Sequence, residues 1–349
     1  MDLNNYKDFL RLDSQNMLGE MNSLPEQLLI AWQEAEALPL GDFSPVRQVI
    51  VAGMGGSAIG ADLLKAYIAP LSTVSIDVHR DYGLPAWAEG PETMVIVSSH
   101  SGNTEETLSA MHTALERGCS LLAISTGGKI SELAKENGTD LWIFQHKGQP
   151  RAAVGYSFCL LLNVFTRLGF IMDPTEELND AVAEMKKQRE LFSVEIPDYQ
   201  NPAKRLAGQL VDRWVSVFGA DLLAPAARRW KGQISEIAKA WGQYEDLPEA
   251  DHNTLAGVVN PESVLVKTMV LFLQADGNHP RNQRRIELTK KNFMVEGIST
   301  DLIQAIGKSR LAQMWTIVQF GDYTAYFLAM AYGVDPTPVV VIENLKREL

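Results

Sequence analysis

The sequence predicts an α/β protein with two domains, each built around a doubly wound parallel sheet. Short apolar runs alternate with stretches in which apolar residues recur at helical spacing. Two of these runs end in loops rich in glycine or serine, and the order of the elements repeats in the second half of the chain. The chain has 349 residues, which is enough for two domains of ordinary size with their own cores.

The first domain is expected to cover residues 46–192, after an N-terminal helical segment at residues 1–45 that prolines bring to an end. The helices expected between its apolar runs favour parallel pairing through right-handed crossovers. Five runs are the predicted strands of this sheet: residues 49–52, 74–78, 94–97, 121–124 and 141–144. A helical pair is expected to follow, at residues 152–168 and 176–191.

The second domain is expected at residues 204–332, after a linker at residues 193–203 that carries two prolines and little periodicity. Its stretch WVSVFGADLL echoes IVAGMGGSAIGADLL of the first domain, which predicts two similar halves. Residues 310–332 are predicted to form one long helix with Gly333 as its C-cap. The remaining residues, 333–349, are expected to form a C-terminal tail.

Two loops of the first domain combine features that suit a phosphate group. Each follows a predicted strand and opens a helix, where free N–H groups and the helix dipole stabilise an anion. Neighbouring parallel strands would bring both loops to one edge of the sheet. The candidate phosphate ligands are the backbone and hydroxyl groups of Gly55, Gly56, Ser57, Ser99, Ser101 and Thr104. The second domain has ADGNHPRNQ in place of SSHSGNTEE, so one phosphate site per chain is expected.

Two other interpretations of these loops remain open. The serine and threonine residues can serve only as N-caps and turn formers. Alternatively, Gly53, Gly55 and Ala58 fit the pattern G-x-G-x-x-A of a dinucleotide site, with Asp77 as the acid that binds a ribose. The second, serine-rich loop argues against this NAD-dependent oxidoreductase, because a dinucleotide fold has no special need for it.

Composition and charge exclude several classes of function. The net charge of −12 argues against a nucleic-acid surface, which needs clustered lysine and arginine. No signal peptide and no membrane-spanning apolar run is expected, so a cytoplasmic protein that does not bind a membrane is predicted. Cys119 and Cys159 lack metal-ligand spacing and suit reduced core thiols, and no metal site is predicted.

Three residues are candidates for acid–base chemistry. Glu236 lies between Ile234 and Ile237, where apolar surroundings can raise the pKa of a carboxylate that takes a proton from carbon. A surface ion pair with a nearby lysine is the simpler interpretation of Glu236. His252, flanked by Asp251 and Asn253, is either a proton donor and acceptor or a structural hydrogen bonder. Arg151 either stabilises an anion or caps a strand end.

These residues carry a resemblance to a known family over nearly the whole chain. The sequence resembles the bifunctional phosphoglucose/phosphomannose isomerases, which contain two sugar isomerase (SIS) domains. The motifs that carry the resemblance are GMGGSAIGAD, SHSGNT, GQPRAA, KGQISEIAK, LPEADHN and the terminal LKREL, in this order. The fold that the resemblance implies is two SIS-type doubly wound parallel-sheet domains, each a flavodoxin-like three-layer sandwich.

The resemblance also implies roles for individual residues. The SIS loops would hold the phosphate of a sugar through Ser57, Ser99, Ser101 and Thr104. The base that moves a proton between C1 and C2 falls on Glu236, the ring-opening histidine on His252, the arginine beside the enediolate on Arg151 and the tail lysine on Lys346. Relatives are dimers in which the partner contributes the histidine, so a homodimer is expected.

The implied activity is the interconversion of glucose 6-phosphate or mannose 6-phosphate with fructose 6-phosphate. This reaction needs ring opening, proton abstraction beside a carbonyl and stabilisation of the enediolate, so no cofactor is expected. A phosphosugar-binding regulator is an alternative, although the acidic chain shows no basic DNA-binding domain. The sequence departs from the family at Thr254, where glutamate is usual, at His100, where tyrosine is usual, and at Ser235 before Glu236. Thr254 is expected to influence the orientation or the pKa of His252.

Overall fold

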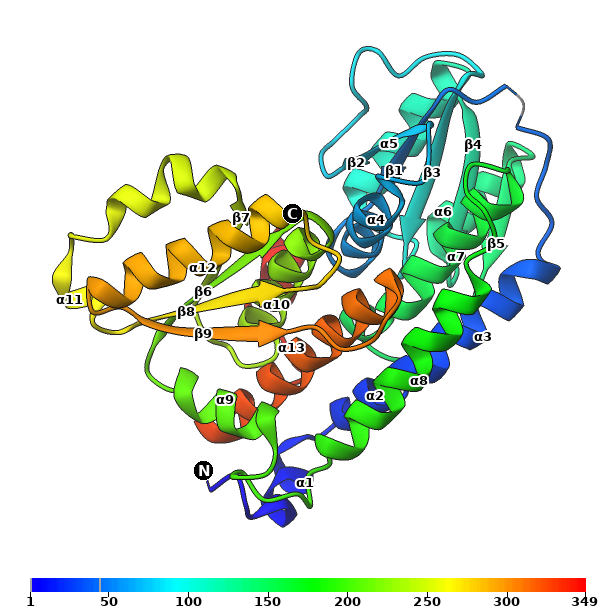
Figure 1. Ribbon diagram of the computed structural model, residues 1–349. Coiled ribbons are helices and arrows are strands. Elements are labelled where there is room, and N and C mark those ends of the chain that lie inside the picture. Colours follow the sequence, from blue (N-terminus) through cyan, green and yellow to red (C-terminus); the bar gives the residue numbers. More distant parts are fainter. Residues whose placement is uncertain (1, 44) are drawn as a thin grey trace. The chain divides into compact units, whose positions relative to one another are not determined.

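The computed structural model describes residues 2–43 and 45–349, which form two compact units (Figure 1). Unit 2 contains Leu24–Asn179, and unit 1 contains the chain up to Ser23 together with Asp180–Leu349. The division falls inside helix α8 (Thr175–Leu191). The domain limits that composition suggests stay predictions.

Unit 2 is organised around a parallel sheet of five strands in the order β2-β1-β3-β4-β5. Apolar side chains dominate its central strands, because a parallel sheet is covered on both faces. All five predicted strands are confirmed to within a few residues: β1 (Gln48–Ala52), β2 (Ser75–His79), β3 (Thr93–Ser99), β4 (Ser120–Ser125) and β5 (Asp140–Ile143).

The helices of unit 2 follow from right-handed crossovers between these strands. On one face, α5 (Glu105–Glu116) and α6 (Gly128–Glu136) bury apolar side chains against alternate residues of β1, β3 and β4. Helix α7 (Val154–Arg167) packs against both α3 (Leu24–Ala37) and α4 (Gly55–Ile68). The helical prediction for residues 1–45 was too long, because α3 ends at Ala37, shortly before Pro39.

Unit 1 repeats this design with a parallel sheet of four strands in the order β7-β6-β8-β9. The strands are β6 (Trp214–Ala220), β7 (Gly242–Leu247), β8 (Thr268–Gln274) and β9 (Ser299–Gln304). In their pairing, β7, β6, β8 and β9 correspond to β2, β1, β3 and β4 of unit 2. The prediction of two similar α/β halves is therefore confirmed, although the described part of unit 1 has no counterpart of β5.

The helices of unit 1 include the long helix that the sequence predicts. Helix α13 spans Arg310–Tyr332, and Gly333 caps it in the left-handed conformation, with φ of 69°. The other helices are α1 (Phe9–Leu12), α2 (Met17–Asn22), α9 (Pro202–Leu210), α10 (Ala224–Glu236), α11 (Glu262–Leu265), α12 (Pro280–Val295) and α14 (Val340–Glu348). Among all described helices, none combines the length and the apolar character that crossing a membrane requires.

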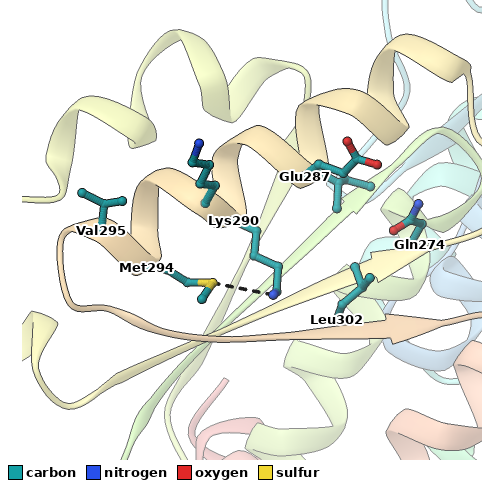
Figure 2. A pocket seen from close by; sticks show the side chains of 8 residues that line it. Gln274, Glu287, Lys290, Met294, Val295 and Leu302 are labelled. Atoms are coloured by element: carbon teal, nitrogen blue, oxygen red, sulfur yellow. Dashed lines mark hydrogen bonds between the residues drawn. The ribbon is translucent and has the colours of Figure 1, made fainter.

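A groove of about 500 Å³ marks the edge of unit 1 where the two halves differ (Figure 2). It lies between α12 and β9, and Figure 2 shows Met294 and Leu302 on its two sides. By strand pairing, Leu302 corresponds to Ala123 of β4, which is fully buried beneath α6. Leu302 is 39% exposed because the chain passes from β9 to α13 without an equivalent of α6.

A buried polar cluster fastens α10 to α13 in the core of unit 1. Arg229 donates two hydrogen bonds to Asp322, at 3.0 and 2.6 Å, and Gln233 donates a third at 3.0 Å. Burial raises the pKa of Asp322, and the charge and hydrogen bonds of Arg229 oppose this rise. Beside this cluster Gly321 lets the two helices approach, since a Cβ there would lie 2.3 Å from Nε1 of Trp230.

Removing one charge of this cluster is expected to destabilise the protein strongly. Arg229→Met leaves the carboxylate of Asp322 buried without its cation, which costs about 3–5 kcal/mol of unfolding free energy. The double variant Arg229→Met/Asp322→Leu should recover most of that loss, because both desolvated charges are gone. Urea denaturation measures the effect, with Arg284→Met as the control at the exposed Arg284–Glu287 pair. An Arg229→Met variant as stable as the control would contradict this account.

Candidate functional site

The first candidate phosphate loop is a strand end, a sharp turn and a helix start. Met54 is extended, and Gly55 adopts φ of 51°, a conformation that glycine takes without strain. Helix α4 begins at Gly55, so the amides of Gly55 and Gly56 have no intrahelical acceptors, whereas the amide of Ser57 donates to the carbonyl oxygen of Met54 at 3.1 Å. Ser57 is buried, and within the described part of the chain its hydroxyl makes no hydrogen bond. These groups can bind an oxyanion.

The second loop places its hydroxyls in two different ways. Ser99 is buried, and its Oγ lies 2.9 Å from Oγ1 of Thr104. Thr104 is the N-cap residue of α5, but its side chain makes no capping hydrogen bond. Ser101 is exposed, and its Oγ accepts the N–H of Asn103 at 3.2 Å. The turn-forming interpretation therefore holds for Ser101, while capping does not explain Thr104.

The two loops meet at the carboxyl edge of the sheet, as predicted, because β1 and β3 are neighbours. Gly53 makes the approach close, since a Cβ there would lie 2.8 Å from the carbonyl oxygen of Ser98 and 3.3 Å from Cβ of Ser57. A side chain at position 53 would push the loops apart. The candidate anion ligands of both loops therefore lie in one local region of unit 2.

The turn that carries Arg151 packs directly on the first loop. Arg151 lies in a 3-10 turn, Pro150–Ala152, and is 5% exposed. Its Nη1 lies 3.3 Å from Oε1 of Gln149. A Cβ at Gly56 would lie 2.5 Å from the carbonyl oxygen of Pro150 and 3.4 Å from Cα of Arg151. The structure thus brings Arg151 next to Gly55, Gly56 and Ser57.

An aromatic and histidine cluster adjoins the second loop. Nε2 of His100 lies 3.0 Å from Nδ1 of His146, and their rings are edge to face. Phe144 and Tyr156 stack on each other and contact His100 and His146, respectively. Sequence reasoning gave His146 no role. His100 follows β3 and His146 follows β5, with β4 between these strands in the sheet, and no sequence signal indicates that two such residues are in contact.

In unit 1 a carboxylate occupies the place that corresponds to the first loop. Gln48 and Trp214 open equivalent strands, and Gly55 and Asp221 follow them at equal distances along the chain. Their φ angles are 51° and 49°. The carboxylate of Asp221 accepts the N–H of His279, the N-cap residue of α12, at 2.9 Å, and Nδ2 of Asn282 at 2.8 Å. In unit 1 the side chain of Asp221 therefore holds the start of α12.

Glu236 is the last residue of α10 and is partly buried. The turn after it is held by Lys239, whose φ is 54° and whose Nζ donates to the carbonyl oxygens of Glu236 at 2.6 Å and Ile237 at 3.3 Å. The same Nζ lies 3.3 Å from the carbonyl oxygen of Pro336. Lys239, which sequence reasoning considered only as an ion-pair partner, thus joins the end of α10 to the segment that leads into α14.

His252 is exposed at the end of a 3-10 turn, Glu249–His252, that follows β7. Asp251, which flanks His252 in the sequence, has its partners on α12, because its carboxylate accepts hydrogen bonds from Arg285 at 2.8 Å and Thr289 at 2.6 Å. Thr254 turns toward Oδ1 of Asn253, which its hydroxyl contacts at 3.2 Å.

Thr254 also hydrogen-bonds Glu245 on β7. Burial raises the pKa of Glu245, and the bond from Thr254 acts in the opposite direction. The influence of Thr254 on His252 stays a prediction. Lys346 lies on α14, of which every residue is exposed.

The dinucleotide interpretation of the first loop also requires an acid that binds a ribose, and Asp77 is not placed for that role. Asp77 lies in the middle of β2, paired with Ile50 of β1, whereas an acid that binds a ribose would stand at the carboxyl end of the strand. Its carboxylate lies 3.8 Å from Nζ of Lys65 on α4. Asp77 is therefore a surface ion-pair residue.

A methyl group at Gly56 is expected to disturb both the first loop and the turn of Arg151. Gly56→Ala places Cβ against backbone atoms that cannot rotate away, so a loss of about 1–3 kcal/mol of stability is expected. Gly208→Ala on α9 is the control, because a Cβ there meets no atom within 4 Å. Urea denaturation of both variants checks this, and equal stabilities would contradict the close contact.

The histidine cluster predicts a loss of stability in mild acid. Burial lowers the pKa of His100 to about 4, and repulsion from His146 adds to the effect. An unfolded histidine has a pKa of about 6.5, so the stabilising contribution is complete above that value and is lost as the pH falls toward 4. The melting temperature of the wild type should fall more steeply over this range than that of His100→Phe. Parallel curves would contradict the prediction.

Comparisons with known proteins agree with this architecture. Residues 42–165 match the SIS domain family, and residues 199–349 match the bacterial phospho-glucose isomerase C-terminal SIS domain. A bifunctional phosphoglucose/phosphomannose isomerase from Caldicellulosiruptor bescii is 36% identical over 95% of this chain and 98% of its own length. The Aquifex aeolicus protein of the same name is 34% identical over 88% of this chain and 92% of its own length.

A solved structure shares the fold at low sequence identity. Tagatose-6-phosphate ketose/aldose isomerase from Escherichia coli aligns with a TM-score of 0.72 at 16% identity, covering 93% of this chain and 95% of that chain. Each parallel sheet described above is thus the centre of a SIS domain. From the identity and coverage of its relatives, the chain belongs to the bifunctional phosphoglucose/phosphomannose isomerase family.

Proposed function

We propose that this protein is an aldose–ketose isomerase that interconverts glucose 6-phosphate, mannose 6-phosphate or both with fructose 6-phosphate. One observation in the molecule carries the proposal: two hydroxyl-bearing loops and the Arg151 turn are packed together at the carboxyl edge of one sheet. This is where open α/β sheets bind ligands. Membership of the isomerase family supplies the reaction class.

The proposed phosphate site lies in unit 2. The first-turn amides at Gly55 and Gly56 and the hydroxyls of Ser57, Ser99, Ser101 and Thr104 are the proposed ligands. Hydrogen bonds from neutral groups suit a site that must release its product, since no buried ion pair has to be broken. The phosphate also fixes the non-reacting end of the sugar, so its binding energy orients C1 and C2.

The proposed chemistry first opens the sugar ring and then moves one proton between carbons and one between oxygens. His252 transfers a proton from the anomeric hydroxyl to the ring oxygen, which opens the ring. The carboxylate of Glu236 then removes the proton from C2 of the open aldose and returns it to C1 of the enediolate. The oxygen on C1 gains a proton while the oxygen on C2 loses one and becomes the ketone.

Arg151 and Lys346 are assigned to the charges that develop in this reaction. A guanidinium beside the enediolate oxygen stabilises negative charge that is present only in the transition state and the intermediate. The burial of Arg151 supports this role, because a charge acts more strongly where water is excluded. Lys346 is assigned to the substrate near its ring oxygen, where its ammonium can donate a hydrogen bond.

The active form is proposed to be a cytoplasmic homodimer. His252 and the whole of α14 are exposed in the single chain, which supports a role for both in contact with a second copy. In this arrangement His252 completes the site of the partner subunit, and a monomer would lack the ring-opening group. The assembled protein would take a small sugar phosphate and would bind neither nucleic acid nor a membrane.

Glu236→Gln tests the proposed base. Removal of a general base is expected to lower kcat by about 10²–10⁴-fold while fructose 6-phosphate still binds, because the phosphate ligands are intact. A coupled assay with glucose 6-phosphate and mannose 6-phosphate measures kcat, and the exchange of the C2 hydrogen with solvent deuterium detects the proton transfer. The control is Glu296→Gln, at the exposed C-cap of α12, which should behave like the wild type.

Two results would overturn the proposal. The wild type would show no turnover of either aldose phosphate, or Glu236→Gln would retain both turnover and exchange at C2. A thermal-shift comparison of fructose 6-phosphate with NAD addresses the oxidoreductase alternative, because only the true ligand class should raise the melting temperature.

A further inference from the structure

Nδ1 of His146 lies within hydrogen-bonding distance of two nitrogens, one from its own turn and one from the second loop. The N–H of Gly148 donates to its Nδ1 at 3.2 Å, and Nε2 of His100 lies 3.0 Å from the same atom. His100 stands between Ser99 and Ser101 in the second phosphate loop. Gly148 opens the short segment Gly148–Gln149–Pro150 that leads into Arg151. One imidazole nitrogen therefore links the two parts of the proposed site.

The backbone N–H of Gly148 fixes the protons of both rings. An amide can only donate, so Nδ1 of His146 must be unprotonated and the proton of this neutral imidazole lies on Nε2. Nε2 of His100 must then be the donor toward His146, which leaves Nδ1 of His100 as the unprotonated nitrogen. The pair is directional: His100 donates, His146 accepts, and Gly148 donates from the other side.

The surroundings hold both rings in this neutral and oriented state. Phe144 contacts His100 edge to face at 5.8 Å between ring centroids, and Tyr156 contacts His146 at 5.7 Å. Burial lowers the pKa values of both histidines, which keeps Nδ1 of His146 free to accept near neutral pH. The carbonyl of His100 is held as well, because Thr126 donates to it through Oγ1 at 2.7 Å.

We propose that His146 is a positioning residue that keeps the Arg151 turn in register with the phosphate loop through its shared Nδ1 acceptor. The inference rests on the proposed function, because it assigns phosphate binding to one loop and enediolate stabilisation to Arg151. Arg151 acts on charge that develops during the reaction, whereas the loop binds phosphate in every state. Loss of the link should therefore lower kcat more than it weakens phosphate binding.

Two substitutions separate the acceptor from the bulk of the ring. His146→Phe keeps an aromatic ring against Tyr156 and removes the acceptor, whereas His146→Asn places Oδ1 near the position of Nδ1. Loss of one buried hydrogen bond that positions the turn should lower kcat in His146→Phe by roughly two- to tenfold. His146→Asn should restore most of that loss. His112→Ala, at an exposed position on α5, is the control for the removal of a histidine.

Inorganic phosphate as a competitive inhibitor reports on the phosphate loop alone. Its inhibition constant should stay within about threefold of the wild type in His146→Phe while kcat falls. A proportional loss of phosphate inhibition would overturn the inference, because the substitution would then have damaged the loop itself. An equal loss of kcat in His146→Phe and His146→Asn would also overturn it, since ring shape and not the acceptor would matter.

Nuclear magnetic resonance tests the hydrogen bonds of His146 without a measurement of enzyme activity. Long-range ¹⁵N–¹H spectra of the wild type near pH 7 should show His146 with an unprotonated Nδ1 and a protonated Nε2. The Nε–H signal of Arg151 should shift in His146→Phe and return toward the wild-type position in His146→Asn. A proton on Nδ1 of His146, or an unmoved Arg151 signal, would overturn the inference. An inactive wild type would instead refute the proposed isomerase function.

Discussion

The site depends on one close backbone contact, between Gly56 at the start of α4 and the turn that carries Arg151. A helix start offers its amides to an anion only where nothing else covers them, and a cationic side chain is useful there only when it is held nearby. With no Cβ at position 56, the carbonyl of Pro150 rests against the first turn of the helix. This close approach is accompanied by the packing of α7, which follows the turn of Arg151, on α4.

Much of the fold can be predicted from the sequence because its signals are local. Short stretches of sequence are enough to predict the strands β1, β3 and β4, the capped helix α13 and the repeat that contains WVSVFGADLL. Each of these corresponds to an observed element. The candidate site is predictable only in part. The first and second phosphate loops are expected to lie close together because β1 pairs with β3.

Contacts made across the fold escaped sequence reasoning. His100 and His146 meet only because the chain has crossed β4 between them, and Asp251 looks like a partner of its neighbour His252 until α12 supplies Arg285 and Thr289. Adjacency in sequence was a poor guide to side-chain direction in a turn. The extra helical length assigned to the N-terminal segment has a simpler cause, since the segment was taken to end at residue 45 although α3 already ends at Ala37, shortly before Pro39.

The two halves show how one architecture can serve two purposes. Unit 2 keeps its glycine at position 55, and the helix start there remains available to a ligand. In unit 1 Asp221 stands at the equivalent place, and its carboxylate accepts hydrogen bonds from His279 and Asn282 at the start of α12. In unit 1 the negative charge at this edge of the sheet thus belongs to the chain itself, whereas the corresponding turn of unit 2 carries a glycine without a side chain.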